Sequence, residues 1–109
     1  MGRESLGEFE QLVLLACLRL GTGAYTVSVV DEIAARTGRD PSPSAVYAAL
    51  RRLEDKELVD SRLGESTPER GGRPKRFFRV RPEAVVPLRE ARDDLLAMWE
   101  GLDGLEGVR

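Results

Sequence analysis

The chain has 109 residues, of which 41% are hydrophobic and 33% charged, and its formal net charge is −2. This length suits one domain with one core, and the composition is that of a globular protein rather than a disordered or membrane-spanning one. A single cysteine and no histidine exclude an internal disulfide and a histidine-based catalytic triad, and no phosphate-binding glycine motif is present, so we expect neither an enzyme nor a metal or cofactor site.

The N-terminal residues give no sign of export. Residues 1–10 hold one arginine and three glutamates and no apolar signal core. The longest apolar run, Leu12 to Leu18, is too short to cross a bilayer. We therefore expect a cytoplasmic protein without a membrane partner.

Apolar residues spaced three and four positions apart predict three helices in the first half of the chain. The first runs from about Leu6 to Gly21 or Gly23 and is apolar on more than one face, so it is either central to the core or shared with a second chain. The second spans Thr26 to Thr37. Its inward residues are expected to be Val27, Val30, Ile33 and Ala34, with Gly38 as its stop. The third runs from Pro43, after a Ser42 N-cap, to about Lys56.

After the third helix the pattern changes to that of strands. Leu58 to Leu63 and Arg76 to Val80 are predicted as strands, and Gly64 to Pro74 as the loop of a long hairpin. From Pro82 a helical pattern returns and continues to about Leu102. The order predicts a mainly α fold with a small β-hairpin: a winged helix-turn-helix over residues 1–81 and a long C-terminal helix over residues 82–109.

Positive charge is concentrated on the predicted hairpin, although the chain as a whole is acidic. Residues 62–81 carry seven basic and two acidic side chains, whereas residues 1–61 and 82–109 are both net negative. Local charge decides contact with phosphates more than total charge does. The hairpin is thus a candidate surface for a polyanion, the alternative being an ordinary flexible basic loop.

Several segments together resemble the PadR-type regulators. They are Leu6-Gly7-Glu8-Phe9-Glu10, Ala24-Tyr25, the pattern Ser-x-Ser-x-x-Tyr-x-x-Leu-x-Arg-Leu-Glu-x-Lys-x-Leu over residues 42–58, and Arg70-Gly71-Gly72-Arg73-Pro74-Lys75-Arg76-Phe77-Phe78. The resemblance covers residues 6 to about 100, and the single last helix is similar to the short branch of the family. Thr26 and Arg81-Pro82-Glu83-Ala84 depart from the family pattern, which leaves the start of the last helix open.

The resemblance and the helix pattern together imply a DNA-binding surface. On the third helix, the candidate contacts to double-stranded DNA are Ser42, Ser44, Tyr47, Arg51 and Arg52. On the hairpin, they are Arg70, Gly71, Gly72, Arg73, Lys75 and Arg76. Two alternatives stay open: Tyr47 could instead be half-buried against the second helix, and Arg51 could be a solvated partner of Asp55.

The last helix carries a heptad seam formed by Ala84, Leu88, Ala91, Leu95, Met98 and Leu102. A lone helix after a wing cannot bury this seam within so small a domain, so we expect a homodimer, the alternative being packing on the chain's own first helix. The expected interface residues are Leu88, Ala91, Leu95, Met98, Trp99 and Leu102. Similarity to short relatives implies that Trp99 could also stack on a planar aromatic effector. Cys17 is expected to be a buried hydrophobe rather than a redox sensor.

The sequence therefore predicts a sequence-specific, DNA-binding transcriptional regulator, acting as a homodimeric repressor on a roughly palindromic operator. The third helix would enter the major groove, and the wing would contact the backbone or minor groove. Two alternatives remain: a winged-helix module that docks only on protein, and a small-molecule binding protein that uses the dimer interface.

Overall fold

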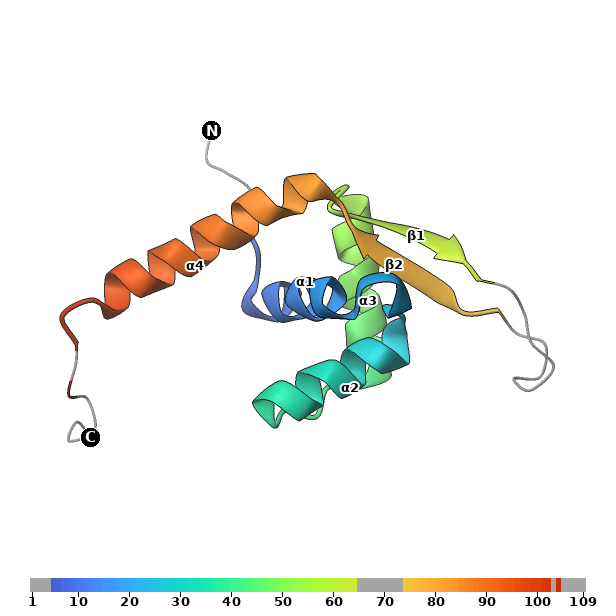
Figure 1. The fold of residues 1–109 in the computed structure, drawn as a ribbon, viewed down its shortest axis with the longest axis horizontal. Coiled ribbons are helices and arrows are strands. Elements are labelled where there is room, and N and C mark those ends of the chain that lie inside the picture. Colours follow the sequence, from blue (N-terminus) through green and yellow to red (C-terminus); the bar gives the residue numbers. More distant parts are fainter. Residues whose placement is uncertain (1–4, 65–73, 103, 105–109) are drawn as a thin grey trace.

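The structure is a computed structural model and describes residues 5–64, 74–102 and 104 (Figure 1). In these residues the elements follow the order α1 (Glu8–Leu20), η1 (Gly21–Gly23), α2 (Thr26–Thr37), α3 (Pro43–Asp55), β1 (Val59–Leu63), β2 (Arg76–Val80), η3 (Pro82–Ala84) and α4 (Val85–Trp99). The predicted fold, mainly α with a small β-hairpin, is confirmed. No helix in the described part of the chain has the length and apolar character needed to cross a membrane.

The helix ends follow the expected local chemistry. The Ser42 hydroxyl accepts a hydrogen bond from the Ala45 amide at 3.1 Å, and Pro43 occupies the first helical position of α3. Gly38 ends α2 in the left-handed region, with φ of 75°. These two caps set the turn between α2 and α3, and thereby fix where the exposed face of α3 begins.

The last helix differs from the prediction at both ends. Pro82 to Ala84 form a 3-10 turn, closed by a bond from the Ala84 amide to the Arg81 carbonyl, so α4 begins only at Val85. At the other end α4 stops at Trp99 rather than near Leu102. Gly101 has a φ of 82°, a left-handed conformation that a helix cannot continue through.

The inward face of α2 was predicted only in part. Ile33 is buried, as expected, but Val27 is 50% exposed and Val29 is fully buried in its place. Val29 and Ile33 are four residues apart, so they lie on the same side of the helix, which faces α1 and α3. The apolar residues of α2 permit either face, and the packing of three helices selects this one.

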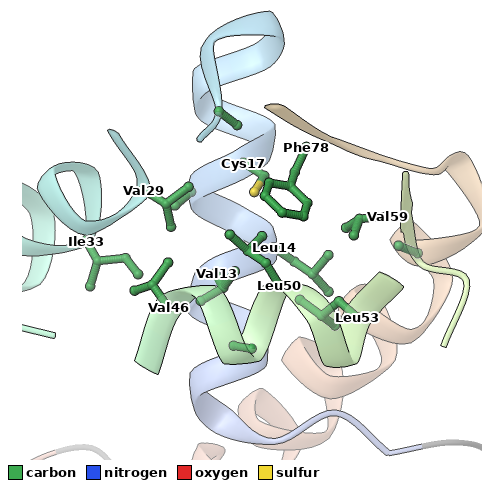
Figure 2. Close-up of a cluster of buried hydrophobic side chains, with 14 of the residues drawn as sticks. Val13, Leu14, Cys17, Val29, Ile33, Val46, Leu50, Leu53, Val59 and Phe78 are labelled. Atoms are coloured by element: carbon green, nitrogen blue, oxygen red, sulfur yellow. The ribbon is translucent and has the colours of Figure 1, made fainter. Parts of the chain in front are cut away.

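One core unites the helices, the hairpin and the start of α4 (Figure 2). Its largest fully buried side chains are Phe78, Leu14, Leu50, Leu53, Val13, Val29, Val46 and Val59. Phe78 brings β2 into this core, and the Phe78 amide donates to the Ala24 carbonyl at 2.8 Å. Cys17 is 2% exposed, and burial raises the pKa of its thiol to about 12. It is therefore a buried small side chain, not a reactive thiolate.

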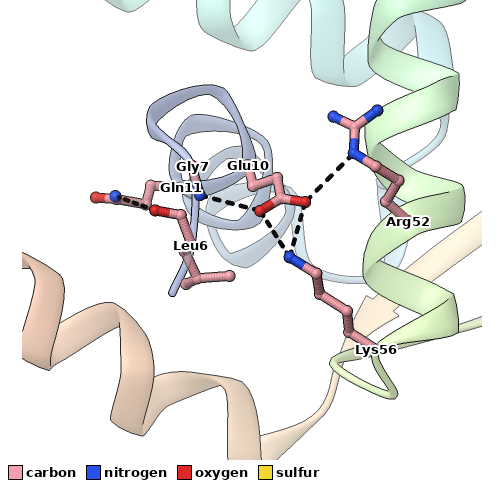
Figure 3. A network of polar contacts seen from close by, with 6 residues as sticks. All are labelled: Leu6, Gly7, Glu10, Gln11, Arg52 and Lys56. Carbon is pink, nitrogen blue, oxygen red and sulfur yellow. Dashed lines mark hydrogen bonds and ion pairs between the residues drawn. The ribbon is translucent and has the colours of Figure 1, made fainter. Parts of the chain in front are cut away.

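A buried carboxylate joins the start of α1 to the end of α3 (Figure 3). Glu10 accepts hydrogen bonds from the Gly7 amide at 3.0 Å and from Lys56 Nζ at 3.0 and 3.1 Å, and Arg52 Nε lies 3.4 Å away. Burial raises the pKa of Glu10, but the Gly7 amide, Lys56 and Arg52 outweigh it, so the pKa lies below its ordinary value.

The helix α4 leaves the body of the molecule after its first turns (Figure 1). Ala84 and Leu88 are buried in the chain's own core. Further along, the exposed fractions rise to 57% for Leu95, 76% for Met98 and 57% for Trp99. Packing against the chain's own core thus accounts for the beginning of the heptad seam, leaves Ala91 partly buried, and leaves Leu95, Met98 and Leu102 exposed.

Candidate nucleic-acid interface

The exposed face of α3 carries the residues predicted to contact DNA. Ser44, Tyr47 and Arg51 are all exposed, while the buried side of the helix supplies Val46, Leu50 and Leu53 to the core. The hydroxyls of Ser42 and Ser44 lie 3.3 Å apart at the N-terminus of the helix. This end combines hydroxyl groups with the positive end of a helix dipole, a setting suited to a phosphate.

Tyr47 lies on the side of α3 that faces the hairpin. Its ring makes an edge-on contact with Phe78 of β2, with centroids 6.4 Å apart, yet 39% of the residue is exposed. Its hydroxyl accepts a hydrogen bond from Arg51 Nη1 at 3.2 Å. Tyr47 therefore orients an arginine on the open face of the helix while it packs against the wing.

Arg51 is half exposed and has two partners. It donates to Tyr47, and its Nε lies 3.4 Å from Glu54, rather than pairing with Asp55 as the alternative interpretation supposed. The hydrogen bond to Tyr47, followed by the nearby Glu54 and Asp55 charges, raises the pKa of Arg51 above its ordinary value. A cation held in this orientation is preorganised for a base or a phosphate.

Arg52, also predicted to contact DNA, has a partner within the protein. Its side chain is 54% exposed, and its Nε lies 3.4 Å from the buried Glu10, in the ion-pair network with α1 (Figure 3). Successive residues of a helix differ by about 100° in direction, which separates Arg52 from the face of Ser44 and Arg51. Arg52 thus contributes to the fold, through Glu10.

Two cations at the base of the hairpin lie over aromatic rings. Lys75 Nζ lies 3.9 Å from the centre of the Tyr25 ring, and Arg62 lies 5.0 Å from the centre of the Phe77 ring. Tyr25 and Phe77 form an edge-to-face contact, with their ring centroids 5.6 Å apart. Aromatic partners orient these two cations without neutralising them, and no acidic side chain of residues 5–64 or 74–102 forms a salt bridge with either.

Other hairpin cations have acidic or hydroxyl partners. Arg79 and Arg81 both pair with Asp60 of β1, at 3.7 and 3.4 Å. Arg76 donates to the Ser61 hydroxyl at 3.0 Å. The candidate wing-tip contacts Arg70, Gly71, Gly72 and Arg73 lie outside the described residues.

The sequence did not predict a role for two side chains at the junction of α3 and the hairpin, Glu54 and Ser61. The Ser61 hydroxyl donates to Glu54 at 2.6 Å, and Glu54 also faces Arg51. The only signal in the sequence was that Glu54 falls within the segment resembling a known family, which says nothing of its partner seven residues further on.

Gly64 leaves room for the ring of Phe77, and we expect Gly64→Ala to disturb the wing. A Cβ at this position would lie 2.7 Å from Phe77 Cε2, and the ring is already held between Tyr25 and Arg62. Forcing an extra methyl into such a contact is expected to lower the free energy of unfolding by about 1–2 kcal/mol.

Urea unfolding checks this prediction, with Gly23→Ala as the control. A Cβ on Gly23 would meet no atom within 4 Å, so that variant should match the wild type closely. Equal stability of the two variants would show that the Phe77 ring is free to move.

The exposed end of α4 presents an apolar surface. Leu95, Met98, Trp99 and Leu102 line an open hollow there, with Trp99 at its side. Each of these four side chains is about half or more exposed. An exposed apolar patch of this kind is typical of an interaction surface.

The comparisons with known proteins agree with this geometry. A family model described as the PadR-like family of transcriptional regulators matches residues 14–83. A PadR family regulator from Eggerthella lenta aligns at 25% identity with a TM-score of 0.67, over 94% of this chain and 88% of its own.

Two further solved structures share the fold at lower identity. F93 from STIV, a winged-helix DNA-binding protein, aligns at 14% identity and a TM-score of 0.65, over 87% of this chain and 95% of its own. BpsR of Bordetella bronchiseptica, whose DNA binding is regulated by 6-hydroxynicotinic acid, aligns at 20% identity and a TM-score of 0.64, over 97% of this chain and 74% of its own. A comparison with curated proteins gives no match.

Proposed function

Since the chain belongs to the PadR-like family of transcriptional regulators, a family of regulators and not of enzymes, we propose that it is a homodimeric repressor that binds a roughly palindromic operator. In this proposal residues 1–81 contact the DNA and residues 82–109 join two chains. Each α3 enters a major groove, and each wing contacts the neighbouring backbone or minor groove. In this proposal the protein acts in the cytoplasm.

One observation supports the DNA-binding surface above others: the exposed cationic face of α3 adjoins the cationic hairpin. Tyr47 of α3 contacts Phe78 of β2, and Arg51 lies on the same exposed side as Tyr47. A groove-reading helix and a backbone-contacting wing must act on adjacent parts of one duplex. The acidic residues that give the chain its net negative charge lie largely outside this hairpin stretch.

The exposed apolar part of α4 supports the dimer. Leu95, Met98 and Trp99 have no place in the chain's own core; Leu95 and Met98 continue the seam of Ala84 and Leu88, and Trp99 lies beside Met98. A second copy of α4, related by a twofold axis, would cover them. The two reading heads would then face half-sites about one helical turn, ~34 Å, or a multiple of it apart.

Selection of duplexes from a randomised library, followed by gel-shift titration at several salt concentrations, tests the function. We expect an enriched site with twofold symmetry and an affinity that falls steeply with salt. A protein-docking module would enrich no sequence and show no shift even at low salt.

Two arginine variants separate the roles of helix and wing. Arg51→Ala is expected to weaken binding to the selected site by about 1–3 kcal/mol and to relax preference at one base position, because an arginine–guanine pair is lost. Arg73→Ala should weaken binding to all sequences and lower the salt slope by about 1, as a phosphate contact does. Equal loss on selected and random DNA for Arg51→Ala would assign Arg51 to the backbone instead.

The hollow beside Trp99 supports a regulatory ligand. Trp99 is the only tryptophan and is 57% exposed, so a planar aromatic effector could stack on it at the interface. Titration of Trp99 fluorescence with planar aromatic compounds tests this, with a parallel gel shift. Quenching together with a changed DNA affinity supports an effector. Quenching in a protein that binds no DNA would instead favour a small-molecule binding protein.

A further inference from the structure

A single carboxylate joins the DNA-facing side of α3 to the hairpin. Glu54 Oε2 accepts a hydrogen bond from the Ser61 hydroxyl of β1 at 2.6 Å, and that hydroxyl accepts one from Arg76 Nη1 of β2 at 3.0 Å. On the other side of the same carboxylate, Arg51 Nε lies 3.4 Å from Oε1. One side chain therefore has an α3 arginine on one oxygen and the wing on the other.

The chemistry of these groups fixes the direction of every bond. An arginine can only donate, and an ionised carboxylate can only accept. The Ser61 hydroxyl must therefore donate its single hydrogen bond to Glu54, and its oxygen must accept the hydrogen bond from Arg76. Ser61→Ala would break this series of hydrogen bonds, whereas Ser61→Thr would keep the hydroxyl and the series.

Burial of one Glu54 oxygen makes the link between Arg51, Glu54 and Ser61 costly to break. Glu54 Oε1 is inaccessible to solvent and makes no hydrogen bond within the described residues, so the ion pair with Arg51 is its compensation. A buried carboxylate oxygen is costly without such a partner. Moving Arg51 away from Glu54, or the wing away from α3, would expose that cost.

We infer that Glu54 is a positioning residue, which holds the reading helix and the wing in one arrangement for DNA through Arg51 on one side and Ser61 with Arg76 on the other. The inference rests on the proposed function. Two elements that must contact a groove and its neighbouring backbone together bind better when their spacing is set in advance.

The test uses full-length Glu54→Gln, Ser61→Ala and Ser61→Thr. Affinities are measured for the duplex that the wild type selects and for a scrambled duplex of the same composition. We expect Glu54→Gln and Ser61→Ala to weaken binding to the selected duplex roughly 3- to 10-fold, with Ser61→Thr close to the wild type. Binding to the scrambled duplex should not weaken, since no cation is removed. Urea unfolding of each variant checks that the fold is kept.

The sign of the Glu54→Gln effect is decisive. Removing a negative charge next to DNA would, by Coulomb attraction alone, strengthen binding to both duplexes. Tighter binding to both duplexes, or a Ser61→Ala variant equal to the wild type, would overturn the inference while the wild type still binds DNA.

A measurement on the free protein tests the link without DNA. The Arg51 Nε–H resonance should shift in Ser61→Ala and Arg76→Ala, and stay in place in Ser61→Thr and in the control Arg79→Ala, whose arginine pairs with Asp60 instead. An Arg51 resonance that ignores Ser61 and Arg76 would refute the link. A wild type that binds no duplex would refute the proposed function separately.

Discussion

Replacing Leu95 by aspartate is expected to convert the proposed dimer to a monomer and to weaken binding to the selected operator by about 100-fold or more. Leu95 is 57% exposed in the single chain, so the change leaves the core untouched. In a paired seam, however, two aspartates would be buried without a counter-charge. A monomer also loses the gain from two half-sites bound by one molecule. Sedimentation equilibrium and gel-shift titration measure the two effects.

Ala97→Asp is the matched control. It adds the same charge to the same helix, but Ala97 is two residues from Leu95 and so lies on nearly the opposite side of α4. We expect this variant to remain dimeric and to bind the operator like the wild type. If Leu95→Asp remained dimeric, the subunits would have to meet at another surface. Identical behaviour of the two variants would exclude the seam as the dimer interface.

The largest effect on stability is expected from Glu10→Gln. Glu10 is 6% exposed and faces Lys56 and Arg52, whose charges would lose their partner. Both cations keep some access to solvent, so the loss should be about 2–3 kcal/mol rather than that of a fully buried pair. Urea unfolding at a fixed protein concentration measures it, because a dimer's stability depends on concentration.

Glu8→Gln provides the comparison within the same helical turn. Glu8 pairs with Arg39 at 2.7 Å, but its side chain is 73% exposed. A solvent-screened pair of this kind is worth at most about 1 kcal/mol. If Glu8→Gln destabilised the protein as much as Glu10→Gln, burial of the Glu10 network would not be the cause.

The lowered pKa of Glu10 also gives a pH dependence with a definite sign. A carboxyl whose pKa is lower in the folded protein than in the unfolded chain adds stability at pH values above its ordinary pKa of 4.5. That contribution is lost as the pH falls from 4.5 through the lower pKa of the folded state. The difference in stability between the wild type and Glu10→Gln should therefore be full at neutral pH and shrink in acid. A difference that stays constant down to low pH would contradict the ion-pair network.

The exposed face of α3, the candidate DNA-binding surface, could be predicted because it depends on local patterns. The Ser42 cap and Pro43 placed the start of α3, and the spacing of Val46, Leu50 and Leu53 left Ser44 and Arg51 on the outside. The pairing of Arg52 with Glu10 could not be predicted, because periodicity gives the direction of a side chain but not the identity of its neighbour. Its partner Glu10 is 42 residues away in the sequence.

The sequence by itself determined the order of helices and strands, the concentration of cations on the hairpin and the apolar seam of the last helix. Each of these depends on backbone hydrogen bonds and side-chain spacing within a few residues. Only the tertiary structure decided that Val29 rather than Val27 faces the core, that Glu10 binds Lys56 across 46 residues, and that Glu54 reaches the wing. Those outcomes depend on which surfaces meet when the helices pack, and packing selects among arrangements that local preference leaves nearly equal.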